Sequence, residues 1–531
     1  MRRLAAAIIC ILLAPALRAA ALPAPGSRSL SLEEAITMAL DCNESIIIQR
    51  ESVVAAEAAK LQARGAYDPA LDLQADYRRA TEPVNSPFSG APGGEAAPTF
   101  RTGEALFSLR QFLPTGGSVV LRMDAARQTT NSEFVLLTPA YDTRVGVEVR
   151  QPLLRGRSID AARLGVRVAA VDRARSAASL RRELTQIAAA VEDGYWSLAS
   201  ARRAVEVREE AVTLADEQLG QTRARVEEGA APESEISQPL AELERRRGEL
   251  YAAREIVSRN ENALKRLILH VNDTAMWATR ILPADDPNVE TKPVDPGDMQ
   301  AALERALSER PELSESSAEV DRRRMESAFA RDALKPGLDA FISYDRLGLA
   351  GSAVDQDPNG PFMATVPGWI EGGLGRSVGT LGEGRFDDTR AGIVLSIPIG
   401  NRSARGGAGI AEAATRQAEA GMDGIRKMIL TEVLNAAAGV DTAAQRVEAA
   451  RSAREAADVQ LSSERDRYSV GLSTNFLVLT RQNDLSRARL DENAALIDYR
   501  KARTEMARAT GSLLGERRIQ VEEQTQTGGA R

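Results

Sequence analysis

Histidine, cysteine and aromatic side chains are scarce in this sequence. Its 531 residues include one histidine, two cysteines and only 4% aromatic residues. The histidine, His270, follows an apolar run, so we expect a packed or capping side chain there and no catalytic pair. The sequence shows no cluster of metal ligands, no phosphate-binding loop and no activated thiol. We therefore expect neither an enzyme nor a bound cofactor or metal.

The two cysteines, Cys10 and Cys42, belong to different parts of the chain. A pair of arginines and an apolar run precede the small residues Ala19–Ala21, so residues 1–21 are predicted to be a signal peptide. The apolar run is short and contains a proline, which argues against a membrane anchor. Removal of the signal peptide leaves Cys42 alone, and this excludes a disulfide within the mature chain.

Basic patches and long apolar runs are also missing. The formal net charge is -7, and no cluster of lysine and arginine indicates a nucleic-acid partner. After the signal peptide there is no apolar run of about 18 residues, so no transmembrane helix is predicted. An exported chain of this kind is expected to be either soluble or a membrane protein built from β-strands.

The chain contains one pattern twice. Residues 35–79 and 302–346 align without a gap at a constant offset of 267. Each segment shows a helical pattern, then a proline (Pro69 or Pro336), then an alternating strand. A repeat this long is too large for a short-period solenoid. We therefore expect two copies of one large unit, residues 30–270 and 301–515, packed as pseudo-equivalent neighbours.

Apolar residues recur at three- and four-residue spacing through most of each copy, which predicts amphipathic helices. Glycine-containing segments break the pattern once in each copy. A helix of about 70 residues is on the order of 100 Å long and needs packed neighbours, and small side chains suit such a coiled-coil seam. The predicted helices are 158–228 and 233–269 in the first copy, and 403–469 and 475–514 in the second.

Alternating segments lie between the helices of each copy. Leu71, Leu73 and Tyr77 alternate with polar residues, for example. The length and alternation are typical of tilted strands that cross a bilayer, and a half-buried strand in a soluble sheet is the alternative. The predicted strands are 69–80 and 141–152 in the first copy, and 337–346 and 388–398 in the second. Segments 81–100 and 348–386 are rich in glycine, proline and serine and are expected to be exposed loops.

The order of these motifs across the mature chain resembles that of the TolC-like outer membrane efflux proteins. The residues that carry the resemblance are Leu32–Ile36 and Arg310–Leu313 at the start of the copies, Gln151–Leu154 and Ile397–Arg402 at the returning strands, and Arg467–Gly471 at a helix end. The fold class implied is mainly α with membrane β: long coiled-coil hairpins and strands that form a trimeric α-barrel tunnel and a shared outer-membrane β-barrel.

The resemblance also implies a function. A homotrimer would be the passive exit duct of a tripartite efflux or type I secretion system in the outer membrane of a Gram-negative bacterium. A periplasmic adaptor (membrane fusion) protein and an inner-membrane pump or ABC transporter would be its partners. Drug efflux and protein secretion both fit, because the pump and the adaptor decide between them. A non-channel coiled-coil scaffold across the periplasm is the alternative, and it would have no need of amphipathic strands.

One segment, residues 102–128, departs from the family pattern. Its turn signal Pro114-Thr115-Gly116-Gly117 predicts an extra hairpin. Strand parity allows the hairpin to join the barrel, which would give a trimer roughly 18 strands in place of roughly 12. A hairpin folded outside the membrane is the alternative.

The helix breaks are the remaining candidate sites. Glu233 and Glu235 follow the first break and, with Tyr468, are candidates for a ring at the periplasmic entrance, although glutamate is also favoured in any first helical turn. In the second copy Leu477 and Thr480 stand where the family often has an acidic residue. The candidate adaptor-docking tips are Gly229, Ala230, Pro232, Gly471, Leu472, Ser473 and Thr474. Residues 271–300 are expected to link the copies as an equatorial belt, and residues 516–531 to be a flexible tail.

Overall fold

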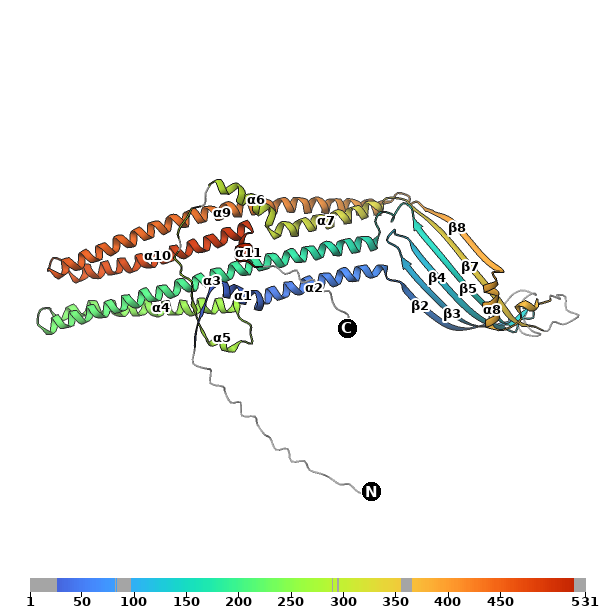
Figure 1. Ribbon diagram of the computed structural model, residues 1–531, viewed down its shortest axis with the longest axis horizontal. Helices are drawn as coiled ribbons and strands as arrows, with labels where there is room; N and C mark the ends of the chain where they lie inside the picture. The colour runs from blue at the N-terminus through green and yellow to red at the C-terminus, as the bar shows by residue number, and fades with distance from the viewer. Residues whose placement is uncertain are drawn as a thin grey trace, which may run out of the picture. The chain divides into compact units, whose positions relative to one another are not determined.

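The computed structural model describes residues 26–81, 83, 97–288, 290–293, 296–354 and 365–519. The predicted signal peptide, much of the expected loop 81–100, part of the expected loop 348–386 and the end of the expected tail lie outside the described residues. The rest is mainly helical with a six-stranded sheet, which confirms the predicted fold class in outline (Figure 1).

The chain divides into two compact units. The first, which we call the helical unit, takes the described residues of Met1–Arg50, Leu180–Pro311 and Lys427–Arg531. The second, the sheet unit, comprises the described residues of Glu51–Ser179 and Glu312–Arg426.

The duplication in the sequence is also a duplication of structural elements. Helices α2 (Glu44–Arg64) and α7 (Pro311–Asp332) begin 267 residues apart, and so do strands β2 (Ala70–Thr81) and β7 (Gly337–Ala353). Helices α1 (Leu32–Cys42) and α6 (Pro296–Glu309) precede α2 and α7 in the two copies. Two copies of the same element order therefore follow one another along the chain.

The long helices form one hairpin in each copy. In the first copy α3 (Ala161–Glu227) is followed by a 3₁₀ turn, η2 (Glu233–Ile236), and by α4 (Ser237–Ile268). In the second, α9 (Arg402–Ser469) is followed by α10 (Asn475–Thr510) and the short α11 (Leu513–Glu516). The α-helix expected from residue 233 thus begins only at Ser237. Among the described residues, no helix combines the length and the apolar character needed to cross a bilayer.

Within the helical unit the four long helices lie in the order α4, α3, α10, α9 (Figure 1). One class of contact recurs along these seams, an arginine on one helix paired with a glutamate on the next. Small side chains fill the space between the charges, as in the α9–α10 core of Ala443, Ala444 and Ala495 around Tyr499. Examples of the ion pairs are Arg202–Glu261 at 2.9 Å (α3–α4), Arg489–Glu210 at 2.7 Å (α10–α3) and Arg454–Glu492 at 2.8 Å (α9–α10).

Part of the segment between the copies pairs with the start of the described chain in the helical unit. Strand β6 (Arg280–Pro283) pairs in parallel with β1 (Ser27–Leu30), after the short helix α5 (Thr274–Ala278). The buried Tyr195 of α3 holds the residues that follow β6: its hydroxyl donates to Asp285 Oδ2 at 2.6 Å and accepts the backbone N–H of Ala284 at 3.0 Å. Burial, together with the hydrogen bond to Asp285, raises the pKa of Tyr195 well above its usual value.

All six strands of the sheet unit form one antiparallel sheet in the order β2-β3-β4-β5-β7-β8. The segment predicted as an extra hairpin forms β3 (Thr99–Phe112) and β4 (Ser118–Thr130), which lie between β2 and β5 (Leu137–Pro152). Its turn is closed by a hydrogen bond from Leu113 N to Gly117 O at 2.8 Å, with Gly116 at a φ of 86°. The hairpin therefore belongs to the sheet and is not folded away from it.

The expectation of an exposed loop over residues 348–386 is wrong for much of that segment. Strand β7 continues to Ala353, and a helix, α8 (Leu374–Glu383), packs on the sheet before β8 (Phe386–Ser396). Three glycines make α8 a poor helix former by propensity, and composition alone therefore favours a loop. Tertiary contacts with β5 and β7 stabilise the helix instead.

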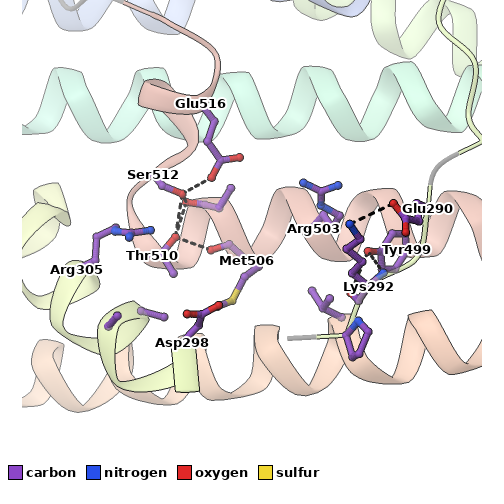
Figure 2. A pocket seen from close by; sticks show the side chains of 15 residues that line it. Glu290, Lys292, Asp298, Arg305, Tyr499, Arg503, Met506, Thr510, Ser512 and Glu516 are labelled. Carbon is purple, nitrogen blue, oxygen red and sulfur yellow. Dashed lines mark hydrogen bonds and ion pairs between the residues drawn. The ribbon is translucent and has the colours of Figure 1, made fainter. Parts of the chain in front are cut away.

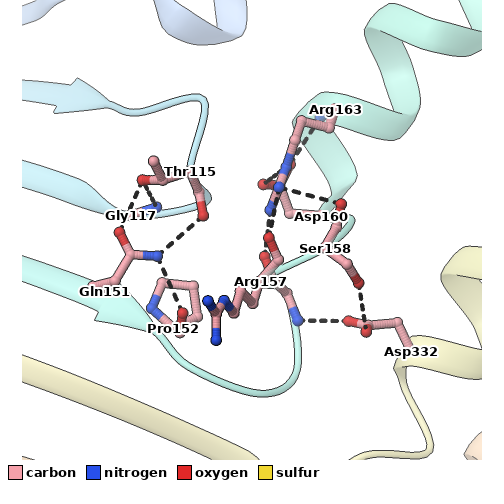
Figure 3. A network of polar contacts seen from close by, with 10 residues as sticks. Thr115, Gly117, Gln151, Pro152, Arg157, Ser158, Asp160, Arg163 and Asp332 are labelled. Atoms are coloured by element: carbon pink, nitrogen blue, oxygen red, sulfur yellow. Dashed lines mark hydrogen bonds and ion pairs between the residues drawn. The ribbon is translucent and has the colours of Figure 1, made fainter.

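A polar network holds the passage from β5 into α3 (Figure 3). The carboxylate of Asp332, at the end of α7, accepts the backbone N–H of Gly156 at 2.5 Å and the hydroxyl of Ser158 at 3.2 Å. Lys335 donates to the same carboxylate at 2.6 Å. Burial acts to raise the pKa of Asp332, but these hydrogen bonds outweigh it and hold the pKa below the ordinary value. The turn into the first long helix is thus fastened to α7.

Candidate functional site

Both helical hairpins end in the same turn. Gly229 and Gly471 each have a left-handed backbone, with φ of 72° and 79°. In each copy the residue after the glycine donates its N–H to the carbonyl of the arginine four residues before the glycine: Ala230 to Arg225 and Leu472 to Arg467, both at 2.8 Å. This is the Schellman arrangement that closes a helix C-terminus. It explains why the arginine–glycine spacing recurs in both copies.

The second tip is apolar and exposed. Thr474 caps α10 by accepting the N–H of Leu477, and the Ser473 hydroxyl bonds to Glu464. The apolar side chains at this tip remain largely in solvent: Val470 is 68% exposed, Leu472 79% and Phe476 60%. Gly229, Ala230 and Pro232 form the corresponding turn of the first copy, just before η2. Both predicted tip segments are therefore accessible helix-hairpin ends.

The predicted entrance residues fall into two groups. Glu233 and Glu235 lie exposed in the first turn that follows the first tip. Tyr468 instead packs on a core cluster of α9 and α10, and its hydroxyl accepts a hydrogen bond from Arg225 Nη1 at 3.1 Å. Among the contacts of the described residues, none joins either glutamate to Tyr468.

Arg225 is a further residue at this site, and it is not among the residues predicted from the sequence. Its hydrogen bond to Tyr468 links the first hairpin to the second beside the two tips. A second cross-copy bond, from the Gln218 side chain on α3 to the Asn475 side chain at the start of α10, lies two helical turns away. An arginine, Arg225 or Arg467, stands four residues before the glycine of each tip. This recurrence indicates the shared turn, but it does not predict that the Arg225 side chain bonds to Tyr468.

The sheet has two chemically different faces. On one face the cross-strand row is apolar from β2 to β5 (Leu73, Phe107, Met123 and Val145) and ends in Arg346 and Asp387 on β7 and β8. The neighbouring row on the same face is Leu71, Leu109, Leu121, Val147 and Tyr344. On the other face the row Asp72, Ser108, Arg122, Gly146, Asp345 and Asp388 is polar or charged. This alternation matches a sheet that separates hydrocarbon from water.

Both edges of the sheet are open within the described chain. Strands β2 and β8 have one neighbour each, and almost all of their side chains are exposed. With six strands that alternate in direction, β2 and β8 run antiparallel to each other. The β8 edge of one copy can therefore pair antiparallel with the β2 edge of another.

A separate pocket of about 490 Å³ lies in the helical unit (Figure 2). The Tyr499 hydroxyl on α10 accepts the backbone N–H of Lys292 at 2.9 Å and donates to the Lys292 carbonyl at 3.1 Å. Lys292 also pairs with Glu290 at 3.1 Å. These contacts hold part of the linker 271–300 against α10. In the described ranges no group of three or more histidine, cysteine, aspartate or glutamate side chains is placed to hold a metal ion.

Comparison with known proteins gives one family and one fold. Residues 302–512 match the model of a family described as outer membrane efflux protein. No curated protein matches the sequence significantly. Among solved structures, the chain is similar to the CmeC outer membrane channel of Campylobacter jejuni, with 15% identity, a TM-score of 0.62, and 91% of this chain and 86% of that one covered.

Two further outer membrane proteins show a similar fold. The outer membrane protein VceC of Vibrio cholerae is 16% identical with a TM-score of 0.60, over 90% of this chain and 96% of that one. The open state of the MtrE outer membrane channel of Neisseria gonorrhoeae is 16% identical with a TM-score of 0.60, over 91% and 89%. At these identities the structures report a shared fold that extends over nearly the whole chain.

Proposed function

We propose that this chain is a TolC-like outer membrane efflux protein and that three copies form a passive exit duct through the outer membrane of a Gram-negative bacterium. The duct extends into the periplasm and conducts small molecules or secreted protein to the exterior. The observation that carries this proposal is the two-faced sheet with two open edges, in a chain that also supplies two long helical hairpins.

The open edges argue for a homotrimer. An unpaired strand edge in lipid leaves backbone N–H and C=O groups without partners, which is prohibitive, so each edge must meet another copy. Six strands from each of three copies give a closed wall of about 18 strands. The outer helices of the helical unit also keep exposed apolar side chains, such as Tyr251 on α4 (64%) and Val459 on α9 (69%). Neighbouring copies would cover these side chains.

The two different faces of the sheet indicate which side of the proposed barrel wall contacts lipid. The apolar rows face lipid, and the charged rows face a water-filled interior. An inner-membrane pump or ABC transporter, reached through a periplasmic adaptor, would supply the energy for transport. The two helix tips are the proposed adaptor-docking sites, since Val470, Leu472 and Phe476 present apolar side chains there in a well-defined turn.

The same end of the helical unit supplies the proposed gate. Glu233 and Glu235, repeated in three copies, would form an acidic ring that favours cations at the entrance. The Arg225–Tyr468 hydrogen bond would hold the two hairpins of each copy together when the entrance is closed. Opening would then separate the tips and break this bond.

Reconstitution of the purified protein into planar lipid bilayers tests the proposed function. We expect a heat-modifiable trimer from the outer-membrane fraction that gives discrete, cation-selective single-channel currents. A periplasm-spanning scaffold without a channel would give no conductance. For docking, a Leu472→Arg variant should fold, insert and conduct but lose transport in cells, because Leu472 is exposed and lies outside the left-handed position of Gly471. Gly439→Arg, on the exposed middle of α9, controls for the added charge.

A further inference from the structure

Helix α8 buries polar side chains and exposes apolar ones, which is the reverse of the arrangement expected for a surface helix in water. Its fully buried side chains are Ser377 and Thr380, each with 0% exposure, and they face the sheet. Its apolar residues recur at helical spacing on another side, where Leu374 is 46% exposed and Val378 54%. A surface helix in water buries the apolar stripe and exposes the hydroxyls. The arrangement of α8 therefore suits surroundings that are not aqueous.

The contacts of α8 fix it on the apolar face of the sheet. The hydroxyls of Ser377 and Thr143 are hydrogen-bonded at 2.9 Å, and Thr380 Oγ1 accepts the N–H of Leu349 at 3.1 Å. Thr143 belongs to the same face of β5 as Val145 and Val147, because residues two apart on a strand share a face. Glycine at position 348 permits the close approach, since a Cβ there would lie 2.2 Å from the Ser377 carbonyl oxygen.

A short cluster around a tryptophan secures both ends of α8. Arg376 Nε donates to the carbonyl of Trp369, and the Arg376 guanidinium pairs with Glu383 at 3.1 Å. Arg385 pairs with the same glutamate at 2.6 Å and stacks over the Trp369 ring at 4.6 Å. Tryptophan and arginine together are typical of the boundary between hydrocarbon and headgroups.

An apolar cleft of about 480 Å³ separates α8 from the strands beside it. Its floor is the apolar row of Leu73, Phe107 and Met123, and its wall is formed by Val378 and Leu381 of α8. The volume lies within the range of about 300–1,000 Å³ that is typical of ligand sites. The cleft lies on the central strands and reaches only β2 among the edge strands, so the cleft and α8 lie within one copy's sheet.

We propose that α8 lies in the outer leaflet of the membrane, with its Leu374–Val378–Leu381 stripe in contact with lipid, and that the cleft beneath it holds a lipid acyl chain. The proposal rests on the proposed function, because it requires the apolar face of the sheet to be in the membrane. The occupant is a lipid and not another protein, since the apolar stripe is continuous with the face that would contact lipid. Helix α8 thus acts as an interfacial clamp for lipid.

Spin-label accessibility in reconstituted trimers tests the proposal. The full chain, with Cys42→Ser, is labelled at a single introduced cysteine and placed in phosphatidylcholine–phosphatidylglycerol vesicles. The sites are Val378→Cys on the α8 stripe and Met123→Cys in the cleft, with Leu71→Cys on the apolar face and Phe476→Cys at the tip as controls. Collision with oxygen, which concentrates in hydrocarbon, is compared with collision with a water-soluble nickel chelate.

The expected result is an oxygen-to-nickel ratio at positions 378 and 123 that matches position 71 and exceeds position 476 several-fold. A nickel-accessible label at 378, with an oxygen-accessible label at 71, would overturn the position of α8 and leave the duct intact. Low access of both reagents at 123 would mean that protein fills the cleft, and would overturn the acyl-chain site. A nickel-accessible label at 71 would instead reject the membrane-facing sheet and the proposed function itself.

Discussion

Loss of the Arg225–Tyr468 hydrogen bond should open the entrance of the duct. The bond joins the two hairpins of one copy at 3.1 Å between exposed groups. A hydrogen bond of this kind contributes about 0.5–1 kcal/mol net, so three copies contribute about 1.5–3 kcal/mol to the closed state. At about 1.4 kcal/mol per tenfold, the Tyr468→Phe variant should raise the open-to-closed ratio roughly 10- to 150-fold.

The arginine side of the bond offers a matched control. Arg225→Gln removes the donor, and Arg467→Gln removes the repeat-equivalent arginine, which is exposed in the last turn of α9. Both changes remove one positive charge near a helix C-terminus, so their effects on the helix dipole are alike. Only Arg225→Gln should raise the open probability in single-channel recordings.

The readout is the open probability at constant unit conductance in planar bilayers. Equal open probabilities for the wild-type chain, Tyr468→Phe and Arg225→Gln would refute the proposal that the Arg225–Tyr468 hydrogen bond holds the entrance closed. An equal increase for Arg225→Gln and Arg467→Gln would assign the effect to charge at the tip and not to the hydrogen bond.

Three further predictions concern the acidic ring of Glu233 and Glu235, the contacts of Asp332 at the turn into α3, and the hairpin of β3 and β4. The double variant Glu233→Gln, Glu235→Gln should lose cation selectivity in reversal-potential measurements, and unchanged selectivity would remove the acidic ring. Since the pKa of Asp332 is lowered in the folded chain, its carboxylate stabilises the fold above its unfolded-state pKa, and this contribution is lost as the pH falls through the folded pKa. Asp332→Asn should therefore lower the free energy of unfolding by about 1–3 kcal/mol at neutral pH, which is measured as a lower melting temperature of the trimer. The difference in melting temperature from wild type should shrink at low pH, and a difference independent of pH would contradict this prediction. Deletion of β3 and β4 keeps β2 antiparallel to β5, so the shortened chain should still insert as a trimer. Its barrel should be about two thirds as wide in electron micrographs, and an unchanged width would place the hairpin outside the barrel wall.

Much of the fold could be predicted from the sequence because the periodicities are long and regular. The repeat offset of 267 located α2, α7, β2 and β7 in advance, and the proline–glycine turn revealed the hairpin of β3 and β4. Helix α8 could not be found in this way. Its glycines predict a loop, and the contacts of Ser377 and Thr380 that stabilise it come from strands far away in the sequence.

The candidate site was predictable only in part, for a similar reason. Turn chemistry is local, so Gly229 and Gly471 could be assigned to helix ends from their neighbours alone. The partner of Tyr468 could not, because Arg225 lies 243 residues away and the pairing depends on how α3 packs near α9 and α10. The roles of Glu233 and Glu235 depend on other copies of the chain and remain proposals.

The central claim is that three copies close one wall around an aqueous duct. An electron cryo-microscopy map of the purified protein in lipid nanodiscs tests it most directly. We predict a threefold assembly with a closed wall of about 18 strands, in which β8 of each copy pairs with β2 of the next. A monomer, or a trimer in which the β2 and β8 edges remain unpaired, would contradict the account.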